Sequence, residues 1–498
     1  MNVNPITRLD YPDPDVIRVE DTYYMVSTTM HFMPGCEILQ SFDLVHWEHV
    51  TYVYETLDHT DAQQLKSGQN IYGQGMWAAS LRYHEGRFYI CFVANDTRKT
   101  YLYTSEKIDG PWKKQLIEGF YHDGSLLFDE DGRNYIVYGN DEIWITELNE
   151  DLTAPKKDGL HRLLVSDHKN PELGYEGSHI QKINGYYYIF LIHSLRDRWM
   201  RTEACFYSDS LEGEFTGGDV LCDDRGYCGQ GMAQGGIVDT PDGKWYAMLF
   251  QDSGAVGRIP ILLPVTWKDH FPVFGQNGHV PEEIEVHSTR PGYIYQPLVG
   301  SDDFCNGLLP RWQFNHDPDP RYYHLDALQG TYTITTREVC TELTQAVNTL
   351  TQRMSYPSCA AEVTVDASAL KEGDVAGLCA LQSCYAAVGI TKHHGKYEVL
   401  MLDKKEDGIL DMTEGTVVES HQMDFRLEAD FCNMKDEARC YYRVNKGDWL
   451  PIGTVHKLYF KLDHFTGCRF GLFCYAAEET GGSACFRDFK YYDVDEIS

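Results

Sequence analysis

The sequence lacks several features that would assign the chain to a particular class of protein. No apolar run approaches the roughly 18 residues that a membrane-spanning helix needs, and no basic region followed by an apolar segment opens the chain. The 15 cysteines are odd in number and scattered, without a C-x-x-C pair. This pattern favours reduced, mostly buried thiols over a disulfide framework. We therefore expect a cytoplasmic protein with no membrane partner.

Basic charge is also scarce. The chain has 43 Lys and Arg against 75 Asp and Glu, a net charge of −32, and no Lys/Arg run. Proteins that bind nucleic acids concentrate basic residues on one face, so we expect no nucleic-acid partner. The acidity argues against a polyanionic ligand and is compatible with a neutral one, although solubility explains much of it. Whether the chain forms a homo-oligomer is left open.

Aromatic residues, in contrast, are abundant, and many of them follow a recurring polar turn. Five such turns lie in residues 1–290, and the strands that follow them carry Tyr24, Tyr89, Tyr135, Tyr188 and Tyr246. Glu-Gly, Asp-Gly and Asn-Gly in four of the turns indicate hairpins, because glycine adopts the positive φ that these turns need. Such a repeat without helical periodicity is typical of propeller blades. We predict an all-β fold with a five-bladed β-propeller catalytic domain over residues 1–295. A β-sandwich with chance similarity between strands is the alternative.

The repeat stops between residues 265 and 300, and the pattern then changes. Residues 301–498 show short strands with a period of two, for example at 332–335 and 360–365, and no helical pattern of real length. Short strands over about 200 residues favour two packed sheets. We therefore predict a C-terminal β-sandwich accessory domain over residues 301–498, of the concanavalin or jelly-roll kind.

The repeat also aligns a set of residues with chemical potential. In each blade, the strand before the turn is expected to line the central channel. Its start lies eleven or twelve positions before the tyrosine. Three carboxylates, a tryptophan and a glutamine occupy this position: Asp13, Asp123, Glu176, Trp77 and Gln234. We predict that these five side chains converge at one end of the channel.

Three carboxylates at equivalent positions suit the hydrolysis of a glycosidic bond. This reaction needs an acid that protonates the leaving oxygen and a base or nucleophile on the opposite face, and a third charge can keep the pKa of the acid high. The longer Glu176 is the expected general acid, Asp13 the general base that activates water, and Asp123 the modulator of the acid's pKa. Each alone also fits a turn or a solvated loop, but their shared position in the repeat favours catalysis.

The same residues stand in motifs of a known family. Segments 11–15 (Tyr-Pro-Asp-Pro-Asp), 122–126 (His-Asp-Gly-Ser-Leu) and 175–179 (Tyr-Glu-Gly-Ser-His) resemble the base, modulator and acid segments of glycoside hydrolase family 43. The resemblance is to its β-xylosidase/α-L-arabinofuranosidase branch, which carries a C-terminal β-sandwich. Segment 77–80 is similar to the family's Trp-Ala-Pro-Asp, with Pro and Asp replaced, and segment 257–260 to one whose arginine reaches the sugar. The resemblance spans the whole chain.

The resemblance implies an inverting, exo-acting glycoside hydrolase. Such an enzyme releases single β-D-xylosyl or α-L-arabinofuranosyl units from oligosaccharides derived from xylan or arabinan. It implies substrate-binding roles for Trp77 and Arg258, and we also assign His31, Phe32 and Gln234 to substrate binding.

The resemblance also raises the question of a metal. Many members hold a calcium or sodium ion in the channel with a histidine of the fifth blade, a position that is Gln234 here. A neutral amide is the weaker ligand, so we assign no metal ligands and expect no required cofactor, and whether a calcium or sodium ion lies in the channel stays open.

Alternatives remain open within and outside the enzyme class. The motifs do not decide between xyloside and arabinofuranoside substrates. A non-catalytic carbohydrate-binding propeller is a second class, although a binder gains little from burying three acids close together. A propeller that serves as a scaffold for protein partners is a third.

Overall fold

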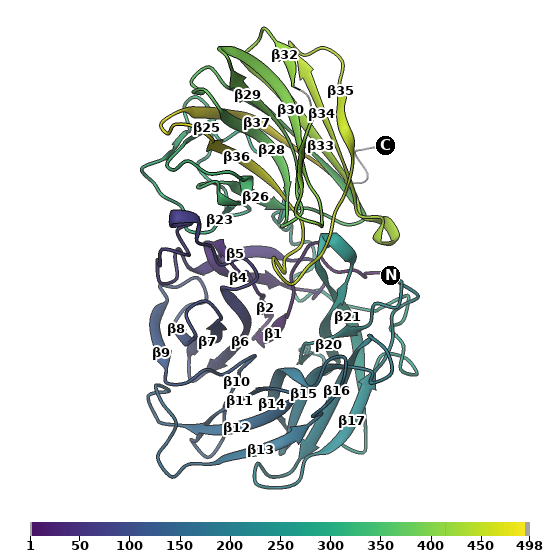
Figure 1. Ribbon diagram of the computed structural model, residues 1–498. Helices are drawn as coiled ribbons and strands as arrows, with labels where there is room; N and C mark the ends of the chain where they lie inside the picture. Colours follow the sequence, from purple (N-terminus) through teal and green to yellow (C-terminus); the bar gives the residue numbers. More distant parts are fainter. Residues whose placement is uncertain (1, 414, 494–498) are drawn as a thin grey trace.

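The computed structural model describes residues 2–413 and 415–493. Within them the chain forms 37 β-strands and four short 3-10 helices, at Lys66–Gly68 (η1), Gly254–Val256 (η2), Leu343–Gln345 (η3) and Cys432–Met434 (η4). Figure 1 shows five small sheets around a central axis and two larger sheets packed beside this ring. The predicted all-β fold is therefore confirmed. No helix in the described part of the chain has the length and apolarity to cross a membrane.

Each of the five small sheets is an antiparallel propeller blade. Blade 1 contains Asp15–Val19 (β1), Thr22–Val26 (β2), Gly35–Ser41 (β4) and Glu48–Tyr54 (β5), and blade 2 contains Met76–His84 (β6), Arg87–Ala94 (β7), Lys99–Ser105 (β8) and Lys113–Ile117 (β9). Blade 3 contains Ser125–Phe128 (β10), Asn134–Asn140 (β11), Glu142–Leu148 (β12) and His161–Ser166 (β13). Blade 4 contains Glu176–Ile183 (β14), Tyr186–Ser194 (β15), Arg201–Ser208 (β16) and Thr216–Leu221 (β17). Blade 5 contains Met232–Ala233 (β18), Ile237–Asp239 (β19), Trp245–Asp252 (β20), Arg258–Lys268 (β21) and Phe271–Phe274 (β22).

The hairpins that start the blades are those indicated by the polar turns. In blade 4, Ile183 pairs with Tyr186, and the two residues between them, Asn184 and Gly185, have φ angles of 51° and 85°. In blade 2, Glu85 and Gly86 have φ angles of 48° and 78°. Positive φ at both turn positions matches the twist of the flanking strands, so the local sequence favours these hairpins. The predicted five-bladed propeller is confirmed.

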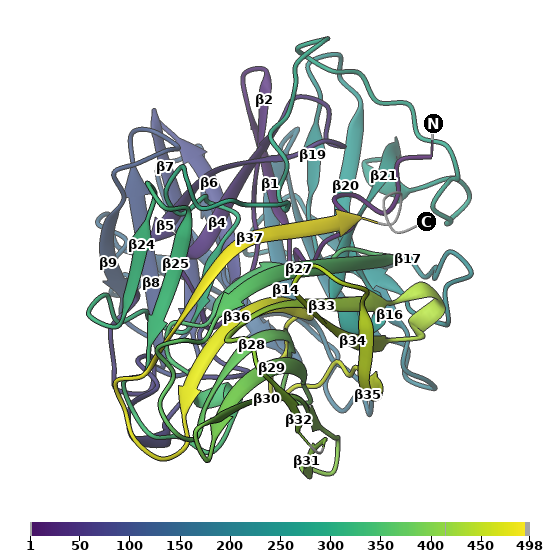
Figure 2. The ribbon, with the colours of Figure 1, turned by 90° about the horizontal axis from the view of Figure 1, so that it is seen from above.

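The remaining strands form the two sheets of the C-terminal sandwich, whose curved strands lie over the propeller when seen from above (Figure 2). One sheet contains Phe32–Met33 (β3), Gln313–Asn315 (β23), Leu350–Arg353 (β26), Arg469–Ala476 (β36), Asp374–Leu381 (β28), Ala386–His393 (β29), Lys396–Lys404 (β30), Leu410–Met412 (β31) and Thr416–Val418 (β32). The other contains Tyr323–Asp326 (β24), Thr331–Thr335 (β25), Ser483–Asp493 (β37), Ser358–Asp366 (β27), Gln422–Asp430 (β33), Glu437–Val444 (β34) and Leu450–Lys457 (β35). Alternating side chains such as Val363, Val365 and Phe425 fill the space between them.

The two domains share a sheet and a buried ion pair. Strand β3 belongs to the first blade in sequence, but it pairs with β23, so the propeller contributes an edge strand to the sandwich. Arg353 of β26 donates to Glu37 of β4 at 2.9 Å, and both side chains are buried. Burial opposes the charge of Glu37, but Arg353 and His49 outweigh it and lower the pKa of Glu37 to about 2. The domains are therefore joined by backbone pairing and by charge.

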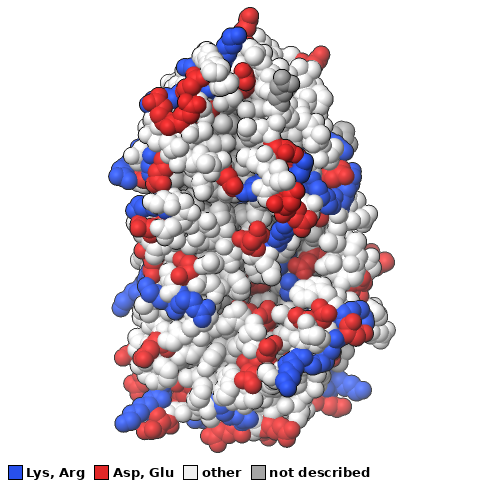
Figure 3. Space-filling view, viewed as in Figure 1, with Lys and Arg blue, Asp and Glu red and all other residues white. Residues whose placement is uncertain are grey.

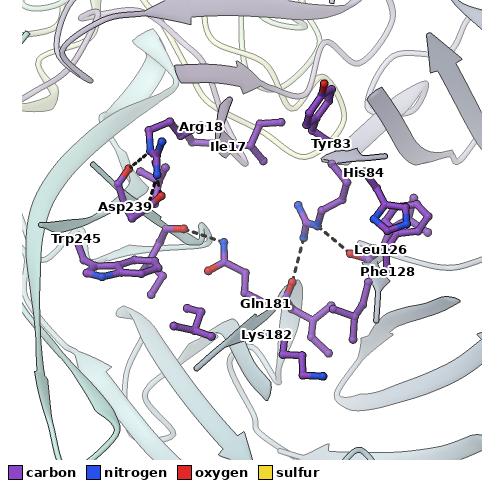
Figure 4. Close-up of a pocket in the computed structure, with 17 residues that line it drawn as sticks. Ile17, Arg18, Tyr83, His84, Leu126, Phe128, Gln181, Lys182, Asp239 and Trp245 are labelled. Carbon is purple, nitrogen blue, oxygen red and sulfur yellow. Dashed lines mark hydrogen bonds and ion pairs between the residues drawn. The ribbon is translucent and has the colours of Figure 1, made fainter. Parts of the chain in front are cut away.

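Arg82 of blade 2 bridges to blades 1, 3 and 4 across the central channel. Its guanidinium donates to Asp15 (2.7 Å), to the carbonyl oxygens of Leu126 (2.8 Å) and Ile180 (3.3 Å), and to Ser125 (2.6 Å). Below it, the far ends of the inner strands line a cavity of about 410 Å³ (Figure 4). None of the predicted catalytic carboxylates lines this cavity, so the predicted site lies at the other end.

Candidate active site

The three predicted catalytic carboxylates gather at one mouth of the channel. Asp13 and Asp123 precede the inner strands β1 and β10, and Glu176 is the first residue of the inner strand β14. His122 links two of them, with its Nε2 3.3 Å from Glu176 Oε2 and 3.6 Å from Asp123 Oδ2. The charge of Asp13 acts on both His122 and Asp123. The structure thus brings together the acids that the repeat aligned.

Irregular backbone at the start of the inner strands directs these side chains into the channel. Asp13, Asp123 and Gln234 have φ angles of 53°, 47° and 59°, values that residues other than glycine rarely adopt. In blades 2 and 4, the pairing register shifts next to Trp77 and Glu176. Bulges and strained residues re-aim side chains and are concentrated at functional sites. The residues at the equivalent positions of the repeat therefore point into the channel for one reason: each stands where the backbone of its inner strand is irregular.

Asp13 is held by two donors and is buried. Thr28 donates its hydroxyl to Asp13 Oδ2 at 2.5 Å, and Arg258 donates Nη1 to Oδ1 at 3.0 Å. The remaining Arg258 donors, Nε and Nη2, are buried without a partner among the described residues. Buried donors without partners are rare, so Arg258 is placed to receive acceptor groups of a ligand.

Asp123 has a shifted acidity. Burial, reinforced by the negative charges of Glu176 and Asp13 and opposed by His122, raises the pKa of Asp123 to about 7. Its Oδ2 accepts the Gly177 amide at 3.1 Å and Nε2 of Gln234 at 3.5 Å. A carboxyl that shares protons near neutral pH beside a second carboxyl is the pattern expected of a modulator.

Sequence reasoning missed two residues that contact Glu176. Asn140 donates to Glu176 Oε2 at 2.7 Å, and His122 Nε2 lies 3.3 Å from the same oxygen. Burial opposes the charge of His122, but the negative Asp123 and Glu176 outweigh it and raise the pKa of His122 to about 9. The positions of both residues in the sequence could have indicated them. His122 precedes Asp123, and Asn140 ends the second strand of blade 3 at the carboxylate end.

An aromatic wall borders the carboxylates, and part of it comes from the sandwich. The ring of Trp77 lies 5.9 Å from that of His122 and 5.5 Å from that of Phe465, which belongs to the loop between β35 and β36. Arg258 lies 4.3 Å from the centre of the Phe465 ring. Asp10 fixes this arrangement, because its two oxygens accept the amides of Arg258 (2.7 Å) and Gly467 (2.8 Å). No sequence pattern indicated Phe465.

Two predicted substrate-binding residues lie elsewhere. His31 and Phe32 have no exposed area and face the sandwich. His31 packs against His464 with ring centres 5.0 Å apart, and Arg469 lies 3.5 Å from the centre of the Phe32 ring. The structure places both in the interface between the domains, because the loop after β2 supplies the strand that pairs with β23.

One set of potential metal ligands converges within residues 2–413 and 415–493. His122, Asp123 and Glu176 each offer an atom within 4.8 Å of the others. Two of these residues are the predicted modulator and acid. The side-chain amide of Gln234 is directed at Asp123.

Comparison with known proteins shows the family to which this chain belongs. Residues 3–272 match the family model described as "Glycosyl hydrolases family 43", and residues 301–492 match "Beta xylosidase C-terminal Concanavalin A-like domain". The chain belongs to glycosyl hydrolase family 43. The resemblance drawn from the motifs is confirmed, and this family 43 chain carries its sandwich in the expected place after the propeller.

Several family 43 relatives resemble the chain over most of its length. A solved structure described as a bifunctional GH43-CE of Bacteroides eggerthii is 42% identical, with a TM-score of 0.92 over 98% of this chain. The chain spans 63% of that protein's length. A "Beta-xylosidase" of Formosa agariphila is 26% identical over 99% of this chain and 89% of its own. A "Non-reducing end alpha-L-arabinofuranosidase" of Bacteroides ovatus is 24% identical over 82% of this chain and 79% of its own.

Proposed function

We propose that this family 43 chain is an inverting, exo-acting glycoside hydrolase that releases single pentose units from oligosaccharides derived from xylan or arabinan. The observation that carries the proposal is the convergence of Asp13, Asp123 and Glu176 at a channel mouth that the Phe465 loop of the sandwich borders.

The contacts of each carboxylate support one role in the reaction. Glu176 receives both of its hydrogen bonds on Oε2, so Oε1 is the oxygen that holds the proton and gives it to the leaving oxygen. Asp13 accepts a proton from a water molecule as the water oxygen attacks the anomeric carbon. The glycosidic bond breaks with its electrons on the leaving oxygen, and the sugar configuration inverts. Asp123 shares protons and charge with Glu176.

The shape of the channel supports exo action. Arg82 bridges blades 1 to 4 across the channel below the carboxylates, and Trp77, Arg258 and Phe465 border it at the mouth. A sugar chain can enter such a pocket with its end but cannot pass through it. The charged side chains on the face in Figure 3 are of both signs and interspersed, which suits a neutral substrate.

The named relatives support both pentoses as substrates. The similar protein of Formosa agariphila is a β-xylosidase by name, and that of Bacteroides ovatus is an arabinofuranosidase. Comparing kcat/KM on 4-nitrophenyl β-D-xyloside and 4-nitrophenyl α-L-arabinofuranoside tells which sugar the pocket prefers. Turnover of neither would favour the alternative, a carbohydrate-binding propeller without catalysis.

Product stereochemistry tests the mechanism itself. Inversion requires room for a water between base and acid, with the carboxyl groups about 6.5–9.5 Å apart. NMR of the products in the first minutes of reaction should show the anomer opposite to that of the substrate. Retention of configuration would rule out the roles given to Asp13 and Glu176.

We propose further that hydrolysis needs no bound cation. Gln234 directs its amide to Asp123 at 3.5 Å, and a cation between Glu176 and His122 would compete with the acid's proton. Dialysis against a chelator should leave kcat/KM unchanged, and added calcium should not raise it.

A further inference from the structure

Trp199 is an exposed tryptophan on the face of the ring that carries the carboxylates. The residue is 44% exposed and lies in the loop between β15 and β16. At this end of blade 4, Glu176 pairs with Ile192, and Ser194 pairs with Arg201. The loop therefore lies at the same end of blade 4 as the proposed acid.

The ring of Trp199 is supported from below. The Arg201 guanidinium lies 5.1 Å from the centre of the Trp199 ring and 5.1 Å from that of Phe250. Arg201 Nε donates to Asp252 at 2.5 Å, and both side chains are mostly buried. A guanidinium clamped by a carboxylate holds the indole in place. Asp252 pairs with Arg201, and the charged neighbours in the loop are paired as well, Arg198 with Asp197 and Arg196 with Asp167.

A row of ring and guanidinium contacts connects Phe250 to the pocket. Arg258 lies 5.2 Å from the centre of the Phe250 ring and 4.3 Å from that of Phe465, and it donates to Asp13. Aromatic rings and guanidinium groups thus alternate from Trp199 to the proposed base. Trp199 stands at the solvent end of this row, fixed relative to the reacting carboxylates.

The part of the substrate that leaves extends in the direction of the exposed ring. The leaving oxygen must face Glu176, so the rest of the substrate extends from the acid toward solvent. Strand β16 is the third strand of blade 4, about 10 Å outward from β14 at ordinary strand spacing. A leaving chain that runs outward over this blade would pass the loop that carries Trp199.

We propose that Trp199 is a stacking platform for a neutral sugar ring of the leaving oligosaccharide, a subsite beyond the scissile bond. The proposal rests on the proposed function and adds that the chain prefers oligosaccharides to short aglycones. The apolar face of a pyranose packs on an indole, which offers a large rigid surface at little cost in conformational entropy.

Kinetics of Trp199→Ala on two kinds of substrate test the proposal. On a β-1,4-linked xylose tetramer, or its arabinose-substituted form if that sugar is preferred, kcat/KM should fall about three- to tenfold, mostly through KM. On the 4-nitrophenyl glycoside, which has no sugar beyond the scissile bond, kcat/KM should stay within about twofold. Trp199→Phe should keep most of the activity on the tetramer.

Tyr83→Ala is the matched control. Tyr83 is 45% exposed and lines the cavity at the opposite end of the channel, so its loss should leave both substrates unaffected. An equal loss on both substrates in Trp199→Ala would show a structural role, and no loss on the tetramer would show that no sugar binds there. Either result overturns the platform while the proposed function stands. A wild-type chain that turns over neither substrate overturns both.

Discussion

Glu176 is the proposed general acid, and the side chains around it orient its carboxyl group. Asn140 and His122 both bind its Oε2 and fix the rotation of the carboxyl group. This leaves the second oxygen as the proton donor. A neighbouring pair of titrating groups, Asp123 with a pKa of about 7 and His122 with one of about 9, surrounds it. The site thus holds exchangeable protons in the range in which a general acid works.

Replacement of Glu176 by glutamine separates protonation from the rest of catalysis. Glu176→Gln should lower kcat on xylose oligomers by about a hundredfold to ten-thousandfold, since their leaving group needs a proton. On a 4-nitrophenyl glycoside, whose leaving group needs little protonation, the loss should be much smaller. Steady-state rates on both substrates measure the difference. An equal loss would assign the acid role to another residue.

His122 is the residue whose charge we expect to set the alkaline limb of the pH profile. As an imidazolium beside Asp123 and Glu176 it favours their charged forms. In His122→Gln the positive charge that lowers the pKa of Asp123 is gone, so the pKa of Asp123 should rise further. The alkaline limb of kcat/KM on xylose oligomers should move upward.

Asn140→Ala is the comparison for that experiment. It removes a neutral donor from the same oxygen of Glu176 and should move the alkaline limb less than His122→Gln. A limb that stays in place in His122→Gln would mean that the histidine only orients the acid.

At the scale of secondary-structure elements, the sequence predicted where the inner strands start but not which loops border the site. The strand starts follow a repeat, and Asp13, Asp123 and Glu176 were found because similar blades place equivalent residues alike. Phe465 follows no repeat. It meets Trp77 across the domain interface, where Asp10 accepts the Gly467 amide from 457 positions away in the chain. A contact made by docking of two domains leaves no local periodicity to detect.

Domain docking also explains why His31 and Phe32, which were assigned to substrate binding, lie elsewhere. They follow the inner hairpin of blade 1 in sequence, near the expected mouth of the channel. The backbone instead turns toward the sandwich and forms β3, which pairs with β23. Sequence alone does not tell whether a short apolar segment faces a ligand or another domain.

The loop between β35 and β36 supplies the wall of the pocket and offers a matched pair of substitutions. Phe465→Ala should lower kcat/KM about ten- to a hundredfold, because the ring that covers Arg258 and contacts Trp77 is lost. Leu462→Ala changes the same loop at a position that is 76% exposed and should keep near-normal activity. Rates on the 4-nitrophenyl glycoside measure both. Equal effects would mean that the loop matters only for its fold.

At the scale of the whole molecule, the propeller and the sandwich are one functional unit. The interface contains the β3–β23 pairing, the buried Glu37–Arg353 pair and the Asp10 bridge to the Phe465 loop. Removal of one partner of a buried ion pair costs about 3–5 kcal/mol, because the other charge remains buried without compensation. The propeller residues of this interface are therefore adapted to the presence of the sandwich.

Arg353→Met tests this coupling while the chain keeps its full length. The folded pKa of Glu37 is depressed, so the stability from the pair is fully present above the unfolded pKa of about 4.5 and is lost as pH falls toward 2. The variant should be less stable than the wild type at pH 7, and the difference should shrink below pH 4.5. Urea unfolding at several pH values measures it, and Glu37→Leu with Arg353→Met should recover part of the loss.

A chain that ends at Gly300 tests whether the propeller can act alone. It would lack Arg353, β23 and Phe465, so Glu37 would keep a buried charge without its partner, β3 would expose an unpaired edge, and the pocket would lose one wall. We expect this chain to be insoluble or, if folded, at least about a hundredfold less active on the 4-nitrophenyl glycoside. Adding Glu37→Leu removes the unpaired charge but not the missing wall, so solubility should improve while activity stays low. A soluble truncated chain with full activity and only single sugars as products would show that the sandwich is dispensable, and that the propeller alone confines the substrate to its end.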